Sequence, residues 1–155
     1  MIASILIIED DNADSELMLL SVQAQCERIK RVRTLEAGLD QIKLQPWDVI
    51  MLDVGLPDSR DAQHAIASVK SAKPIESAIV VVSGNDNPDE MRAGILANAD
   101  GWVVKGKWGA LLHEVRAAYE HHRHCVRIAA ISDSIKKQGG VPRSGEGGEG
   151  RGERA

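Results

Sequence analysis

Polar side chains that could handle a phosphoryl group follow four separate apolar runs of this sequence. The runs cover residues 5–8, 49–52, 79–82 and 101–104, and the side chains that follow them are Glu9, Asp10, Asp53, Ser83 and Lys105. Neighbouring carboxylates repel one another unless they are protonated or a cation lies among them. Glu9, Asp10 and Asp53 offer the hard oxygen ligands that Mg²⁺ takes, with water and a backbone carbonyl completing its coordination.

Ser83 and Lys105 would complete a site for a phosphoryl group. Ser83 supplies a hydroxyl, and Lys105 supplies a fixed positive charge that, with the metal, would neutralise the equatorial oxygens of the group in transfer. A carboxylate oxygen of Asp53 could then attack phosphorus in line. These residue types therefore predict an aspartyl phosphate at Asp53.

Each of these residues also has an ordinary structural interpretation. Asp10 or Asp11 could simply cap the helix that follows, which is a common role for Asp after a strand. Lys105 alone could be a solvated strand-end lysine. Trp102, which lies in the run at residues 101–104, could simply belong to the hydrophobic core. A functional site is favoured over these separate structural roles, because parallel strands bring their carboxyl ends, and the residues that follow them, to one edge of a sheet. Perturbed carboxylates also gather at functional sites.

The elements that would position these residues alternate along the chain. The expected strands cover residues 5–8, 29–34, 47–53, 79–82 and 101–104, and apolar residues at helical spacing lie between and after them. This alternation predicts an α/β fold, with a parallel sheet covered by helices on both faces. In the first helix, Ala13, Leu17, Leu20 and Ala24 share one face, which predicts that this face packs on the sheet.

Composition limits the function. The 155 residues suit one domain, and the net charge of −4 leaves about −6 on residues 1–135. An acidic body argues against direct DNA binding. Cys26 and Cys125 are too few for a disulfide framework and fit a reducing compartment. Because no apolar run reaches membrane-spanning length and no signal peptide is evident, we expect a cytoplasmic protein without membrane contact.

The C-terminal part should differ from the domain, which we place at residues 1–122. Ile128, Ile131 and Ile135 have helical spacing and predict a helical extension over residues 123–135. Its apolar side could lie on its own domain, or it could contact a partner or a second copy in a homodimer. Residues 136–155 contain seven glycines and are expected to form a disordered tail. No second folded domain fits in this stretch.

Two further motifs are weaker. Residues 121–125 contain three histidines and a cysteine, but His near a helix end is ordinarily a solvated cation, and zinc sites need properly spaced ligands. Residues 145–150 match the Gly-x-Gly-x-x-Gly fingerprint of dinucleotide sites. No strand precedes that match and no helix follows it, so we interpret it as a product of low complexity.

The sequence resembles the response-regulator receiver domains of two-component signalling. The matching segments are residues 5–11, 48–57, 79–84 and 101–105, which occur in family order and at family spacing. The resemblance implies a flavodoxin-like receiver fold with five parallel strands in the order 2-1-3-4-5. It also implies a phosphoprotein of the single-domain response regulator type.

The resemblance assigns roles to particular residues. They are Asp53 as phosphoacceptor, Glu9 and Asp10 as acidic pair, Asp10, Asp53 and the Gly55 carbonyl as Mg²⁺ ligands, Ser83 as switch hydroxyl, Lys105 as phosphate-binding lysine, and Trp102 as switch aromatic. The phosphoryl donor would be a phosphohistidine on a sensor histidine kinase or a histidine phosphotransfer protein. Phosphorylation would draw Ser83 toward the phosphate and let Trp102 move inward. That movement would repack the face of helix four, strand five and helix five for a downstream protein target or phosphorelay.

Two features depart from or vary within the family pattern. Gly106 stands where the family usually has a proline whose cis bond aims the lysine, so the sequence permits this turn without imposing it. Gly55 has no side chain two residues beyond Asp53, while Asn85 lies two residues beyond Ser83. We expect positions 55 and 85 to influence the lifetime of the aspartyl phosphate.

Two other functions compete with this interpretation. A Mg²⁺-dependent phosphohydrolase that forms an aspartyl phosphate, similar to the haloacid-dehalogenase group, needs an acid two residues past its nucleophile, where this chain has Gly55. A phosphorylation-independent interaction domain would be expected to lose one of the five pocket residues, and none is missing. We therefore expect a signalling protein and not an enzyme.

Overall fold

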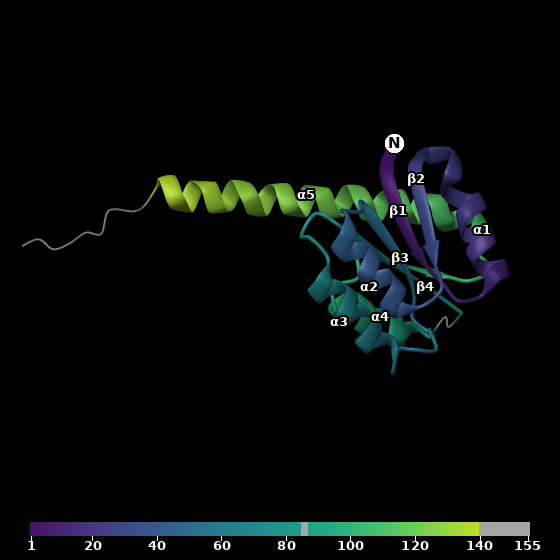
Figure 1. The fold of residues 1–155 in the computed structure, drawn as a ribbon. Helices are drawn as coiled ribbons and strands as arrows, with labels where there is room; N and C mark the ends of the chain where they lie inside the picture. Colours follow the sequence, from purple (N-terminus) through teal and green to yellow (C-terminus); the bar gives the residue numbers. More distant parts are fainter. Residues whose placement is uncertain (85–86, 140–155) are drawn as a thin grey trace, which may run out of the picture. The chain divides into compact units, whose positions relative to one another are not determined.

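The computed structural model describes residues 1–84 and 87–139, in which strands and helices alternate (Figure 1). The strands are β1 (Ile2–Ile8), β2 (Cys26–Val32), β3 (Val49–Asp53), β4 (Ala78–Ser83) and β5 (Gly101–Val104). The α-helices are α1 (Asn12–Val22), α2 (Leu35–Leu44), α3 (Ala62–Ala72), α4 (Pro88–Leu96) and α5 (Leu111–Gln138). The chain divides into a compact unit, Met1–Arg123, and a second unit, His124–Ala155.

The strands form one parallel sheet in the order β2-β1-β3-β4-β5, which confirms the predicted fold class and order. β3 and β4 are buried along their whole length, as their unbroken apolar runs predict. β2 is an edge strand with several exposed charged residues, which discourage pairing with another chain. The register pairs Asp53 with Val82 and Ser83 with Val104, so the strand ends meet at one edge.

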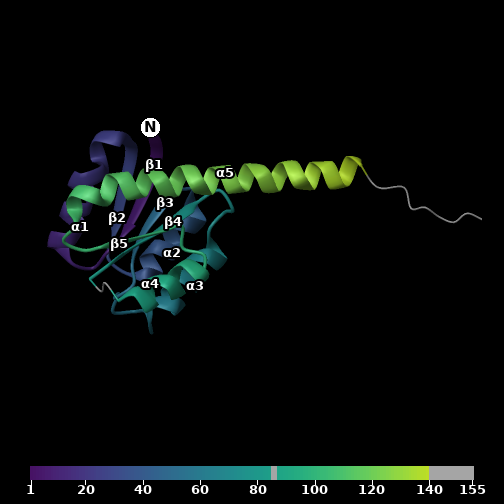
Figure 2. The same cartoon turned by 180° about the vertical axis from the view of Figure 1, so that it is seen from behind.

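Within Met1–Arg123, helices cover both faces of the sheet (Figures 1 and 2). On one face, the core cluster includes Leu6 of β1 and Ile66 of α3, and it also takes in α2. On the other face, Met18 of α1 and Leu111 of α5 pack with Ile7 of β1. The predicted two-sided cover is therefore present, and an aliphatic core holds it together.

The face that α1 turns to the sheet is not the predicted one. Ala13, Leu17, Leu20 and Ala24 are all exposed, with Leu20 54% exposed, and the prediction for them was wrong. The buried residues of α1 are instead Ser15, Met18 and Val22. Both sets have helical spacing, and the position at which the chain leaves β1 and starts α1 decides which one meets the sheet.

Side-chain caps fix where the helices begin. The caps are Asp11 for α1, Thr34 for α2, Asp61 for α3 and Asn87 for α4. Asp58 makes a further contact with α2, because its carboxylate accepts hydrogen bonds from the backbone N–H of Leu35 at 2.9 Å and of Glu36 at 3.0 Å. The loop that follows β3 is thereby tied to the start of α2.

Helix α5 extends well beyond residue 122. It runs to Gln138 and therefore includes residues 123–135 and the first residues of the predicted tail. Residues 140–155, which hold the rest of that tail and the glycine fingerprint at 145–150, lie outside the described residues. Of the helices described in residues 1–84 and 87–139, none is long and apolar enough to cross a membrane.

Candidate functional site

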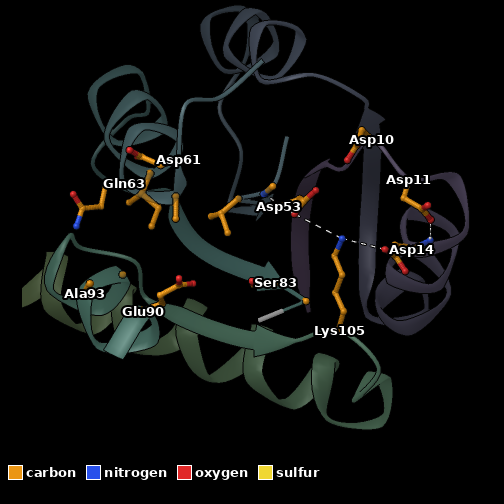
Figure 3. Close-up of a pocket in the computed structure, with 16 residues that line it drawn as sticks. Asp10, Asp11, Asp14, Asp53, Asp61, Gln63, Ser83, Glu90, Ala93 and Lys105 are labelled. Atoms are coloured by element: carbon orange, nitrogen blue, oxygen red, sulfur yellow. Dashed lines mark hydrogen bonds and ion pairs between the residues drawn. The ribbon is translucent and has the colours of Figure 1, made fainter. Parts of the chain in front are cut away.

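A cavity of about 770 Å³ opens at the carboxyl edge of the sheet (Figure 3). Asp10, Asp53, Gly55, Ser83 and Lys105 all line this cavity. Glu9 lies beside it, where its side chain is buried and forms an ion pair with Lys105. The structure thus brings together the carboxylates, the hydroxyl and the amine that the sequence placed after separate strands.

Strand ends position most of these side chains. Asp53 and Ser83 are the last residues of β3 and β4, and Lys105 directly follows β5. Asp10 lies two residues beyond β1, in the turn that leads to the Asp11 cap of α1. The backbone N–H of Lys105 donates to the carbonyl of Ser83 at 2.7 Å, which holds the ends of β4 and β5 together.

The amine of Lys105 reaches three carboxylates, and two of them, those of Asp14 and Asp53, are drawn in Figure 3. It forms an ion pair with Glu9, and it lies 3.0 Å from Asp14 Oδ2 and 3.7 Å from Asp53 Oδ1. The next residue, Gly106, has a φ of 98°, a conformation that favours glycine. The described peptide bonds include no cis bond, and this turn contains no proline. The orientation of the Lys105 side chain is therefore fixed by its ion pairs.

The carboxylates of Glu9, Asp10 and Asp53 form a potential cation site. One oxygen from each lies within 4.8 Å of the others, and the described residues contain no second group of three His, Cys, Asp or Glu placed to hold a metal. Glu9 Oε2 is buried without a hydrogen-bond partner among the described residues. Such an orphaned oxygen is costly unless a proton or a cation satisfies it. The cluster of hard oxygens therefore fits a divalent cation such as Mg²⁺.

The acidic pair and Asp53 differ in how they hold protons. Burial and the nearby Asp53 raise the pKa of Glu9 to about 9. Burial, with Asp53, also raises the pKa of Asp10. Burial acts in the same direction on Asp53, but Glu9, the N–H of Gly55 and Lys105 outweigh it and lower the pKa of Asp53. Of the three carboxylates, Asp53 is thus the one whose pKa is lowered, which favours the ionised form that a nucleophile needs.

Gly55 lies directly against the predicted acceptor. Its backbone N–H donates to Asp53 Oδ1 at 3.0 Å, which holds the carboxylate in place. A Cβ added to Gly55 would lie 3.6 Å from the same oxygen, at ordinary contact distance. A Cβ at position 55 would therefore fit beside Asp53. The other position predicted to influence phosphate lifetime, Asn85, lies outside the described residues.

Ser83 and Trp102 come from neighbouring strands but have different surroundings. Ser83 lines the cavity at the end of β4. Trp102 lies in β5, opposite Val81 of β4, and its side chain is buried beside Gly94 of α4. Sequence alone could not assign the burial of Trp102, which depends on the position of α4.

The sequence interpretation did not include Asp14 among the residues of the site. Asp14 lies in the first turn of α1, lines the cavity and pairs with Lys105. A signal was present, because a helix that starts at the end of a central strand brings the acids of its first turn to the same edge of the sheet.

The histidine-rich stretch at residues 121–125 includes a structural contact within Met1–Arg123. His122 Nδ1 lies 2.8 Å from Asp100 Oδ1, and its Nε2 lies 2.6 Å from the carbonyl oxygen of Ile75. Asp100 in turn accepts a hydrogen bond from the N–H of Ile79 at 2.8 Å. These bonds tie α5 to the start of β4, far along the sheet from the cavity.

Comparison with protein families gives a match over most of the chain. A family model described as the response regulator receiver domain matches residues 5–116. Among curated proteins, the chain is similar to the cell cycle response regulator CtrA of Brucella ovis and of Brucella anthropi, with 27% identity over 101 residues in each case. These matches cover 65% of this chain but only 43% of each relative, so the chain matches less than half of their length.

Solved structures show the same fold. The beryllofluoride-activated receiver domain of DrrB has 25% identity and a TM-score of 0.67, covering 77% of this chain and 99% of that one. The receiver domain of the response regulator NarL from Mycobacterium tuberculosis has 17% identity and a TM-score of 0.65, covering 76% and 96%. The second likeness is one of fold alone.

Proposed function

The chain belongs to the response regulator receiver domain family, and on that premise we propose that it accepts a phosphoryl group on Asp53. The donor would be a phosphohistidine on a sensor histidine kinase or a histidine phosphotransfer protein. One observation supports this proposal: Asp53 lines the cavity with Lys105 Nζ 3.7 Å from its Oδ1, and its pKa is lowered whereas the pKa values of the neighbouring Glu9 and Asp10 are raised. These surroundings support Asp53 as the nucleophile.

The transfer needs one bond to form and one to break. An oxygen of Asp53 forms the bond to phosphorus while the phosphorus–nitrogen bond of the phosphohistidine breaks, and the electron pair of that bond stays on the imidazole. Lys105, 3.7 Å from Asp53 Oδ1, is placed to pair with an oxygen of the transferred group. The N–H of Gly55 orients Asp53 for the attack.

The acidic residues would hold Mg²⁺ for this step. Asp10, Asp53 and the Gly55 carbonyl would be its protein ligands, with Glu9 as the other member of the acidic pair. When bound, the ion would supply positive charge against the phosphoryl oxygens. Because a carboxylate binds a cation in its ionised form and the pKa of Glu9 is raised to about 9, binding of the ion would favour the ionised form of Glu9.

Phosphorylation would act on the surface through Ser83 and Trp102. Ser83 lies at the cavity, where its hydroxyl could bond a phosphoryl oxygen, and Trp102 lies one strand away against α4. Because Trp102 is already buried in this structure, phosphorylation would stabilise that inward position, and the face made by α4, β5 and the first turns of α5 would change by a shift of population between two states. We infer that a downstream protein target reads that face, or that the phosphoryl group passes onward in a phosphorelay.

Acceptance of the phosphoryl group is favoured over phosphohydrolase activity. An enzyme of the second kind needs an acid to protonate its leaving group. Gly55 offers no side chain there, and Lys105 is paired with carboxylates and holds its proton tightly, because Glu9 and Asp14 raise its pKa despite burial.

The helical segment after Arg123 suggests a contact with another chain. Ile128, Ile131 and Ile135 are each more than half exposed, and they repeat at spacings of three and four residues. These residues lie in the last turns of α5, and an apolar stripe left in water adds little stability, because most helix stability in proteins comes from packing an apolar face. We propose that this stripe mediates homodimer formation.

Phosphoryl acceptance is tested by intact mass. The protein is incubated with Mg²⁺ and a small phosphoryl donor, and we expect the gain of one phosphoryl group, which depends on Mg²⁺ and is absent in Asp53→Asn. Asp61→Asn, which removes a different carboxylate at the cavity, should still gain the group. No gain in the wild type, or a gain that persists in Asp53→Asn, would contradict the proposal.

A further inference from the structure

The indole of Trp102 is buried against α4 where only a glycine leaves room for it. Trp102 is 8% exposed and contributes to the core on the α2 and α3 side of the sheet. A Cβ built on Gly94 would lie 2.6 Å from the indole Cε3 and closer still to Cζ3. Packed interiors do not accommodate such an approach, so a side chain at position 94 would have to displace the ring.

The backbone does not explain a glycine at this position. Gly94 lies inside α4 and does not adopt the left-handed conformation that only glycine takes easily. Glycine is a poor helix former, so alanine would suit the helix better. Gly94 is also the one buried residue of α4. The structure therefore explains this glycine by the space that the indole of Trp102 occupies.

The buried ring also carries a polar group that opposes its burial. Trp102 Nε1 is buried and has no hydrogen-bond partner among residues 1–84 and 87–139. An N–H group without an acceptor favours the return of the ring to water. Packing against Gly94 favours the inward position and the orphan N–H opposes it. Because the two contributions oppose each other, a modest change can shift the position of the ring.

Gly94 also borders the predicted phosphoryl site. Together with Ala93 it lines the cavity that contains Asp53 and Ser83. The same turn of α4 therefore touches the indole on one side and the cavity on the other. A displacement of this turn would therefore change both the packing of the indole and the lining of the cavity.

We propose that Gly94 is a positioning residue that sets how far Trp102 can turn inward. It thereby sets how strongly a phosphoryl group at Asp53 changes the face of α4, β5 and the first turns of α5. The coupling rests on the proposed function, because it requires phosphorylation of Asp53. Gly94 acts through Trp102 and contacts no reacting atom.

The test adds one methyl group, in Gly94→Ala, and follows Trp102 directly. The protein is labelled with 5-fluorotryptophan, and the Trp102 resonance is assigned with Trp47→Phe and Trp108→Phe. In the wild type this resonance should show little change between H₂O and D₂O, as a buried ring does. In Gly94→Ala it should show the larger change of a ring in water. The concentration of beryllofluoride, a phosphoryl mimic, that half-saturates the protein should rise about tenfold.

Size rescue separates this role from a general packing defect. In a Trp102→Tyr background, adding Gly94→Ala should alter half-saturation by less than about twofold, because the smaller ring leaves room for the methyl group. Gly109→Ala is the matched control, since a Cβ there meets nothing within 4 Å. If Gly94→Ala fails to fold by circular dichroism, recovery of folding in the double variant supports the proposal, and failure of both variants overturns it.

Two further results would overturn the proposal. One is a Trp102 resonance that stays shielded from solvent in Gly94→Ala. The other is that Gly94→Ala weakens beryllofluoride binding as much in the Trp102→Tyr background as in the wild type. If the wild type binds no beryllofluoride and gains no phosphoryl group, the proposed function fails. The solvent sensitivity of the Trp102 resonance still shows whether Gly94 controls the position of the ring. Failure of the proposed function can therefore be distinguished from failure of the Gly94 proposal.

Discussion

At the scale of single residues, the three carboxylates of the site differ in the direction of their pKa shifts. Burial and mutual repulsion raise the pKa values of Glu9 and Asp10, whereas hydrogen bonds and Lys105 lower that of Asp53. Residue types and strand ends were enough to predict which side chains meet. The opposite directions of these pKa shifts could not be predicted, because they depend on the burial of Glu9 and on the hydrogen bond from Gly55.

Lys105 is the residue whose removal should affect transfer most selectively. Lys105→Met removes the positive charge 3.7 Å from Asp53 Oδ1, and a lost electrostatic contact to a developing charge costs on the order of 100-fold in rate. We expect phosphoryl gain, followed by intact mass with a small donor, to slow by about that factor. Lys107→Met removes an exposed lysine nearby and should leave the rate unchanged. An equal effect of both variants would contradict the assigned role.

At the scale of elements, periodicity identified the strands and helices but did not always identify their faces. β3, β4 and β5 were predicted close to their observed bounds because long apolar runs leave few alternatives. The prediction for α1 failed because Leu17 and Leu20 lie three residues apart and the buried Met18 and Val22 lie four apart, and both spacings are typical of one helix face. Periodicity gives the width of an apolar stripe, and the preceding turn gives its direction.

The contact between Asp58 and α2 gives a pH-dependent contribution to stability. Burial alone would raise the pKa of Asp58, but the N–H groups of Glu36 and Leu35 hold it below its ordinary value. Because the folded-state pKa is the lower one, the stabilisation is complete above the unfolded pKa of about 3.9. It is lost as the pH falls through the folded pKa.

Asp58→Asn should therefore lower the free energy of unfolding by about 1 kcal/mol at pH 7. The difference from wild type should shrink in acid, once Asp58 is itself protonated. Urea unfolding at a series of pH values measures both effects. Asp40→Asn, an exposed carboxylate within α2, is the control and should show little change. A pH-independent difference for Asp58→Asn would show that charge plays no part in this contact.

At the scale of the whole molecule, the sheet brings five chain segments to one edge and leaves other surfaces free to specify partners. Sequence patterns could predict this edge because parallel topology fixes where strands end. They could not predict the buried position of the Trp102 side chain, because its contact with Gly94 depends on how α4 packs beside β5. Contacts between distant segments are the part that periodicity does not contain.

The isoleucine stripe on the helix after Arg123 makes a prediction about assembly. Ile131→Glu places a charge in the middle of the stripe and should convert a dimer to a monomer, since a buried unpaired charge is costly. Sedimentation equilibrium over a range of concentrations measures the change. Ala130→Glu adds the same charge at the neighbouring exposed position and should leave the dimer intact. A wild type that stays monomeric at every concentration would contradict the dimer.

The central claim is that Asp53 receives the phosphoryl group, and chemical mapping of the acyl phosphate tests it most directly. The phosphorylated protein is reduced with borohydride, which converts an aspartyl phosphate to homoserine, and the digested peptides are sequenced by mass spectrometry. The account predicts the reduced residue at position 53 and nowhere else in the acidic cluster. Reduction at Asp10 or Asp11, or no reduced aspartate at all, would contradict it.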